Sequence, residues 1–200
     1  PDPDSYDFTF ERRVTIEGET WTTTASGTVD GSAVACEVSL SGPAVRADRS
    51  LIAAGGRLWA GDSLEDLDPR GTAGALDRTM LALCPAWPVT LEAAGLGGLA
   101  DGTPAVHDLD GMPAEGYSGG TEDLAAALGI DPETVTVEVF NVWIRAGTSW
   151  VVDLDLAVTG DIRALLQLTG DGYAADATAT VTIAQRITAI GEAGPIIPPG

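Results

Sequence analysis

The chain has 200 residues, of which 44% are hydrophobic, and its formal net charge is −20. A chain of this length buries roughly 70% of its unfolded surface, so the composition indicates a folded protein. All ten basic residues are arginine, and the sequence has no basic stripe of the kind that binds phosphates, which argues against nucleic acid as a partner. Such an acidic surface is typical of a soluble secreted protein, with adaptation to salt as the alternative.

The beginning of the chain predicts a short tether followed by one domain. Residues 1–5 are polar and rich in proline, so we expect them to be extended, and no linker divides residues 6–200. No run of about 18 apolar residues occurs, which argues against a membrane-spanning helix. The first residue is not Met, and we therefore expect that an upstream targeting segment has been removed.

Alternating apolar and polar residues predict an antiparallel meander of about five strands from Tyr6 to Ala60. The later strands of this meander are expected at residues 21–29, 34–40, 45–53 and 58–60, with turns that contain glycine between them. In the first strand, at residues 6–16, one face carries Phe8, Phe10, Val14 and Ile16.

Helical spacing replaces alternation in the middle of the chain. Leucines and Met80 predict a helix at residues 72–83, and a second short helix is expected at residues 89–96. A strand broken near Gly111 is expected at residues 107–117. Residues 121–128 predict a third helix, which begins with acidic residues and ends before Gly129.

The last third of the chain returns to strands. Residues 134–145 and 149–159 predict a hairpin with one apolar face, and a second hairpin is expected from residues 163–169 and 174–190, before an extended tail at 193–200. The order of strands, helices and strands predicts one α+β domain. We expect a single curved antiparallel sheet of about ten strands with a few helices packed on one side.

The sequence offers no catalytic or metal-binding constellation. His107 is the only histidine, no Gly-x-Ser-x-Gly motif occurs, and neither cysteine has a histidine or basic neighbour. The segment from Asp108 to Gly111 lacks the further oxygen ligands of a calcium loop. Asp153 and Asp155 share one strand face, which we expect to be solvated. We therefore expect a protein without catalysis, metal or cofactor.

Cys36 and Cys84 are the two cysteines. In an extracytoplasmic protein such a pair indicates one disulfide, which here closes a loop of about 48 residues and joins a strand to a helix. Two buried free thiols are the alternative.

The large apolar residues are the remaining candidates for a functional role. For each of them, core packing is the alternative to ligand contact. A single sheet of about ten strands with few helices is short of covering material, so either the helices close on it or an apolar ligand fills the gap. The candidate cavity residues are Phe8, Phe10, Leu58, Trp59, Leu76, Met80, Trp87, Phe140 and Trp143.

Several local patterns follow one another in a characteristic order along residues 6–199. They are Phe8-Thr9-Phe10, Gly56-Arg57-Leu58-Trp59, a leucine-rich helical region at 76–96, a strand end at 111–117, the hairpin Val142-Trp143-Ile144-Arg145 with Leu154-Asp155-Leu156, and Pro195-Ile196-Ile197-Pro198. In this order the patterns resemble the LppX/LprG group of mycobacterial lipid-binding lipoproteins.

This resemblance implies a U-shaped half-barrel with helices on its concave side, similar in outline to the LolA-type lipoprotein carriers. In the family the cavity holds acyl chains of envelope lipids, and an acylated Cys ahead of a flexible tether anchors the protein. We therefore expect an extracytoplasmic lipoprotein or secreted protein that carries or presents a lipid, with Tyr117 or Arg145 near the head group. The alternatives are a sensory or protein-binding domain of the same fold with an envelope partner, and an enzyme that uses acidic residues.

Overall fold

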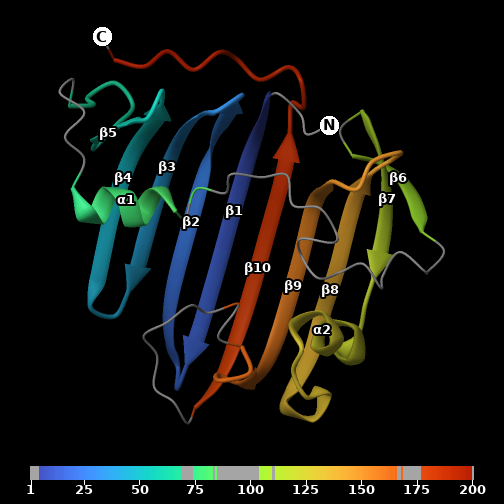
Figure 1. Cartoon of the computed structure of the whole chain (residues 1–200). Coiled ribbons are helices and arrows are strands. Elements are labelled where there is room, and N and C mark those ends of the chain that lie inside the picture. The colour runs from blue at the N-terminus through green and yellow to red at the C-terminus, as the bar shows by residue number, and fades with distance from the viewer. Residues whose placement is uncertain are drawn as a thin grey trace. The chain divides into compact units, whose positions relative to one another are not determined.

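Ten strands form one sheet in the part of the chain that the structure describes. The computed structural model describes residues 5–68, 74–82, 84, 104–109, 111–165, 168 and 177–199. Within them the strand order is β5-β4-β3-β2-β1-β10-β9-β8-β7-β6, so the sheet is open, with β5 and β6 at its edges (Figure 1). Two α-helices accompany the sheet among the described residues. This architecture confirms the predicted α+β class.

The strands occupy both ends of the described chain, with the helices in its middle. The elements are β1 (Ser5–Ile16), β2 (Glu19–Asp30), β3 (Ala33–Gly42), β4 (Val45–Ala54), β5 (Arg57–Gly61), α1 (Ala75–Leu81), β6 (Ala105–Leu109), β7 (Met112–Ser118), α2 (Thr121–Leu128), the 3-10 helix η2 (Pro132–Thr134), β8 (Val135–Arg145), β9 (Val151–Asp161) and β10 (Thr178–Thr188).

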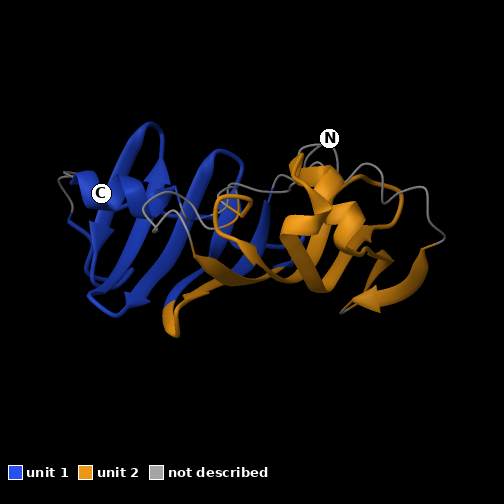
Figure 2. Cartoon of the chain, turned by 90° about the horizontal axis from the view of Figure 1, so that it is seen from below, with its two compact units in different colours: residues 1–11, 21–87, 186–200 blue, residues 12–20, 88–185 orange. Residues whose placement is uncertain are grey.

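Internal contacts divide the chain into two compact units (Figure 2). Unit 1 contains residues 1–11, 21–87 and 186–200, and unit 2 contains residues 12–20 and 88–185. The expectation of one domain over residues 6–200 stays a prediction, and each unit is therefore described by itself. Ser5, which we expected in the tether, is the first residue of β1.

Short turns join the strands of the meander as the sequence predicts. At the β4–β5 turn, Gly55 and Gly56 have φ angles of 56° and 77°. Two consecutive residues with positive φ match the right-handed twist of the flanking strands, and glycine adopts this conformation without steric strain. The β4–β5 turn is therefore favoured by the local sequence.

The predicted bounds are correct for helix α2 and too wide for helix α1. Helix α2 covers residues 121–128 as predicted, and Gly129 ends it with a φ of 68°. Helix α1 is shorter than the predicted 72–83, since it covers Ala75–Leu81. The helix predicted at 89–96 lies outside the described residues.

The strand predicted at residues 163–169 is wrong at its start. Residues 162–165 form turns, in which the N–H of Leu165 donates to the carbonyl of Asp161. Ile162 and Leu165 are both buried, and their spacing of three suits one helical turn and not a strand. Residues 193–199, which fall within the predicted tail, carry neither helix nor strand.

Candidate functional site

Strand register defines two faces of the sheet in unit 1. Ile52 pairs with Trp59, and both are buried in a cluster with Leu67. Ile196, from the C-terminal segment, packs against this cluster, and its N–H donates to the Asp30 carboxylate at 3.4 Å. We call this side, defined by Ile52 and Trp59, the tail face.

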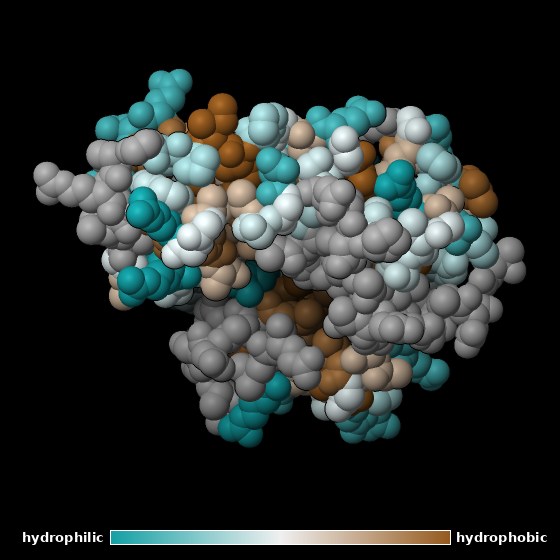
Figure 3. Space-filling view, turned by 45° about the horizontal axis from the view of Figure 1, so that its top comes forward, coloured by the Kyte–Doolittle hydropathy of each residue, from teal (hydrophilic) through white to brown (hydrophobic). Residues whose placement is uncertain are grey.

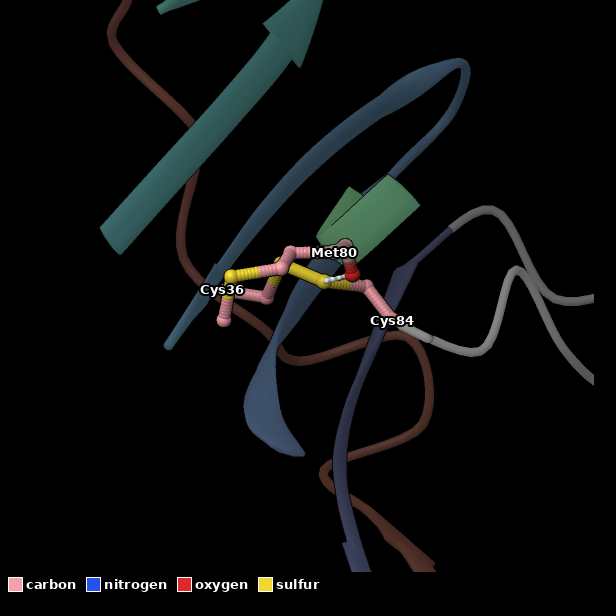
Figure 4. Close-up of a disulfide and its surroundings, with 3 residues drawn as sticks. All are labelled: Cys36, Met80 and Cys84. Carbon is pink, nitrogen blue, oxygen red and sulfur yellow. Dashed lines mark hydrogen bonds between the residues drawn. A yellow bond between two sulfur atoms is a disulfide. The ribbon is translucent and has the colours of Figure 1, made fainter. Parts of the chain in front are cut away.

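The opposite side of unit 1 carries helix α1. Cys36 pairs with Leu51 on this side, and neither side chain is exposed. Cys36 is bonded to Cys84, with a Cα–Cα distance of 6.4 Å, which confirms the predicted disulfide. Figure 4 shows the bond beneath α1, where Sγ of Cys84 lies 3.7 Å from the carbonyl oxygen of the fully buried Met80. We call this side, defined by Cys36 and Leu51, the disulfide face.

An ion pair also fixes α1 to the disulfide face. The Nε of Arg49, on β4, donates to Oδ1 of Asp77 at 3.2 Å. The other oxygen of Asp77 accepts from the N–H of Gly74 at 2.7 Å, which satisfies a backbone donor at the start of the helix. One carboxylate therefore caps the helix and holds it to the sheet.

A row of half-buried apolar residues lies next to the disulfide on the same face. Ala53 pairs with Val34 on one side and with Leu58 on the other, and all three side chains are half-buried. Paired residues of neighbouring strands share a face, and the face alternates with each residue. This row is therefore on the disulfide face, and its side chains are partly exposed.

The aromatic residues of β1 in unit 1 point to the disulfide face. The Thr28 hydroxyl donates to Asp7 Oδ1 at 2.6 Å, and Thr28 belongs to the tail face because it pairs with Ala35. Asp7 therefore lies on the tail face as well. Because side chains alternate along a strand, Phe8 and Phe10 lie on the disulfide face.

The predicted cavity residues of unit 1 do not all share one face. Phe8, Phe10 and Leu58 lie on the disulfide face. Met80, a residue of α1, is buried at the same face. Trp59 follows Leu58 directly and lies on the tail face, so the structure does not bring these two side chains together on one face. Leu76 is 48% exposed, and Trp87 lies outside the described residues.

The sheet in unit 2 has one strongly buried apolar face. Phe140 pairs with Leu156, and Val142 pairs with Leu154. Phe140, Val142, Leu156 and the next residue of the same parity, Val158, are all buried. We call the side defined by these four residues the buried face. Helix α2 packs against β8, where the N–H of Val137 donates to the Thr121 hydroxyl.

Strand β10 contributes to this buried face. The hydroxyls of Thr159 and Thr180 lie 3.0 Å apart, so these residues share the opposite face. Val158 directly precedes Thr159, and Val181 directly follows Thr180. Because side chains alternate along a strand, both valines lie on the buried face. Along β10, Ala179, Val181 and Gln185 are buried and the alternate residues are more exposed.

Gln185 is a buried polar residue that the sequence analysis did not single out. Its side chain is 4% exposed, and its Nε2 has no hydrogen-bond partner among the residues that the structure describes. The alternation along β10 carries a signal for it, because Gln185 shares the parity of Val181 and Ile183. A polar residue at an apolar position of the alternation is thus the sequence signal for this site.

The other face of β8 holds an aromatic and cationic cluster. Trp143 covers Gly116, where a Cβ atom would overlap the indole ring, and the indole ring meets His107 edge to face at 4.9 Å between centroids. Arg145 lies over the ring of Trp150 at 5.5 Å. Trp143 is thus on the face opposite to Phe140, so these two predicted cavity residues do not line one surface.

The polar groups expected near a head group are also on opposite faces. Tyr117 pairs with Val142 and lies on the buried face, whereas Arg145 pairs with Ala114 and lies on the Trp143 side. The Tyr117 hydroxyl donates to Glu115 at 3.3 Å. Burial raises the pKa of the Tyr117 phenol above its ordinary value, and the negative charge and hydrogen bond of Glu115 raise it further.

Replacing Glu115 by Gln is expected to lower the pKa of Tyr117 toward its ordinary value of about 10, because the carboxylate charge is removed while the burial remains. With its folded-state pKa raised, the neutral phenol contributes stability below pH about 10, and that contribution is lost as pH rises through the folded pKa. Phenolate absorbance against pH, with Tyr117→Phe subtracted to isolate this residue, measures the shift. An identical titration of Tyr117 in the wild type and Glu115→Gln would contradict the contact.

The histidine and the Asp-Leu-Asp-Gly segment have structural roles in the described residues. His107 packs against Trp143, and the Asp108 carboxylate accepts from the N–H of Gly111 at the β6–β7 turn. Asp110 lies outside the described residues. Across the part of the chain that the structure describes, no group of three His, Cys, Asp or Glu residues is placed to hold a metal ion.

Comparison with known proteins assigns no family. No family model matches the chain, and no curated protein matches it. A solved structure of a DUF1329 family protein from Desulfovibrio piger aligns with 92% of this chain and 84% of its own, at 10% identity and a TM-score of 0.22. A likeness at this level supports neither a family nor a function, so the resemblance to the LppX/LprG group stays a prediction.

The disulfide bears on the compartment in which the protein folds. Bonds of this kind persist in oxidising environments outside the cytoplasm, so the Cys36–Cys84 bond indicates an extracytoplasmic protein. None of the helices among the described residues has the length and apolar character needed to cross a bilayer.

Proposed function

We propose that this protein binds acyl chains of an envelope lipid on the apolar faces of its sheet, for carriage or presentation and without catalysis. The observation that carries the proposal is the small size of the helices in comparison with the apolar faces of the sheet. Ten strands present long apolar faces, whereas the two α-helices among the described residues have only seven and eight residues. Hydrophobic residues also reach the surface between hydrophilic ones in Figure 3.

The half-buried row of Val34, Ala53 and Leu58 is the proposed contact surface in unit 1. It continues the disulfide face, on which Phe8 is buried. Small side chains such as Ala53 leave volume next to the sheet, which an acyl chain fills. Each CH₂ group transferred from water contributes about 0.8 kcal/mol, so one long chain supplies enough affinity without specific polar contacts.

The wider setting follows from the family resemblance and belongs to the proposal. An acylated Cys upstream of residues 1–5 would hold the protein at the membrane. The net charge of −20 disfavours direct adhesion to an anionic bilayer, which makes such an anchor necessary for a role at the membrane surface. An envelope protein that delivers or receives the lipid is a further expected partner.

A protein- or peptide-binding role is the alternative, and strand β6 favours it. This strand is at an edge of the sheet, and its Val106 is 72% exposed. An exposed edge strand with an apolar side chain is suited to pairing with an extended peptide. Such a protein would bind no lipid, and replacing Val106 would alter peptide binding alone.

The test of the lipid proposal is mass spectrometry of the intact protein under native conditions, together with analysis of its organic extract. We expect a stoichiometric lipid or fatty-acid adduct. An Ala53→Phe variant fills the half-buried row and should reduce lipid uptake while remaining folded. Ser26→Phe adds the same ring on the exposed side of β2 and should leave uptake unchanged. A protein that is free of adduct and refuses added lipid would contradict the proposal.

A further inference from the structure

One polar side chain interrupts the apolar row of the central strand β10. Ala179 and Val181 are fully buried and Ile183 is half-buried on the buried face of unit 2. Gln185 occupies the next position of the same parity and is 4% exposed. Its Nε2 carries two N–H donors, and neither has an acceptor among the described residues.

This arrangement destabilises the folded protein in the absence of an acceptor. A buried amide that has left water without a new hydrogen bond is unfavourable, whereas Leu or Met at the same position would be well accommodated among Val181 and Ile183. An orphaned buried polar group in an otherwise apolar row therefore points to an acceptor that arrives with a bound molecule.

The chemistry of the site restricts that acceptor. An amide N–H requires an oxygen or nitrogen lone pair, which a hydrocarbon chain does not have. A free carboxylate is disfavoured, because the protein has a net charge of −20 and a buried anion without a paired cation is strongly unfavourable. An ester carbonyl is neutral, accepts a hydrogen bond and is attached directly to an acyl chain.

We propose that Gln185 Nε2 donates a hydrogen bond to the ester carbonyl of a neutral acyl lipid bound on the buried face of unit 2. The inference rests on the proposed lipid-binding function and deepens it, since it names the ligand as an ester-linked neutral lipid and places its carbonyl at β10. Val181 and Ile183, which precede Gln185 on the same face of unit 2, contact the chain, and the amide fixes how far the chain enters.

The experiment compares two ligands of equal chain length, methyl palmitate and a linear alkane, on the wild type and on Gln185→Met. Both are delivered from cyclodextrin, and binding is followed by displacement of a neutral fluorescent apolar probe. Met has nearly the same length as Gln and no donor. We expect Gln185→Met to weaken methyl palmitate binding about five-fold, to leave alkane binding unchanged, and to raise the melting temperature of the ligand-free protein.

Control variants keep the result interpretable. Thr182→Ala is on the exposed side of the same strand and should change the affinity for neither ligand. If Gln185→Met does not fold, Gln185→Leu replaces it. Tighter binding of palmitic acid than of its methyl ester by the wild type would overturn the assignment of a neutral ester.

Two outcomes separate this inference from the proposed function. If the wild type binds both ligands and Gln185→Met weakens both equally, or neither, Gln185 acts through packing or through a trapped water molecule, and only the inference fails. If the wild type binds neither ligand, the lipid-binding function fails and the inference fails with it.

Discussion

Loss of the Cys36–Cys84 disulfide is expected to lower the free energy of unfolding by about 4 kcal/mol, since the bond closes a loop with a sequence separation of 48. In the reduced protein the unfolded chain regains the conformational entropy that this loop removes. Urea unfolding of the wild type against Cys36→Ser/Cys84→Ser measures the difference. The mass of the alkylated protein with and without prior reduction verifies that the bond is present.

The ion pair of helix α1, which precedes Cys84 in the chain, provides a matched comparison. Arg49 and Asp77 also join α1 to β4, but the side chain of Arg49 is one-third exposed, so Arg49→Met should reduce stability by about 1 kcal/mol or less. A disulfide variant as stable as the wild type would contradict the loop argument. An Arg49→Met effect as large as that of the disulfide would show that the ion pair is the main anchor.

Phe140→Ala is expected to lower the free energy of unfolding by about 3–5 kcal/mol. Phe140 is 3% exposed and lies on the buried face of unit 2, opposite Leu156. Removing its ring leaves a cavity that the neighbouring strands, held by their hydrogen bonds, fill only in part. Thermal and urea unfolding of the purified variant measure the loss.

The neighbouring residue on the same strand is the control for this substitution. Val139 follows the alternation to the other face and is 40% exposed, so Val139→Ala should reduce stability by about 1 kcal/mol or less. Similar losses for Val139→Ala and Phe140→Ala would contradict the assignment of faces.

Added lipid should raise the melting temperature of the wild type, because a ligand that binds only the folded state stabilises it.

Features that depend on neighbouring residues were predictable from the sequence. The alternation of residues 6–16 gave β1, and the Gly55-Gly56 pair gave the β4–β5 turn. Helix α2 has its predicted bounds, because Gly129 ends it with a left-handed conformation that the preceding residues do not adopt easily. In each case the backbone dihedrals of a few residues decide the outcome.

A local pattern is misleading where its spacing admits two interpretations. Leu165 falls within the strand predicted at residues 163–169, but its spacing of three from Ile162 places both side chains on one side of a turn. The Asp161 carboxylate accepts from the N–H of Arg163, which favours the turn over a ladder with β9. A short apolar run cannot be assigned by periodicity alone.

The amino-acid sequence by itself determined the α+β class, most of the strands and the pair of cysteines that join α1 to the sheet. Only the tertiary structure decided which face of the sheet each residue occupies and which segment packs against that face. Leu58 and Trp59 look equivalent in the sequence, yet one lies beside the disulfide and the other under Ile196. The physical reason is that strand register and the packing of distant segments set the surroundings of a side chain, and neither is encoded in its neighbours along the chain.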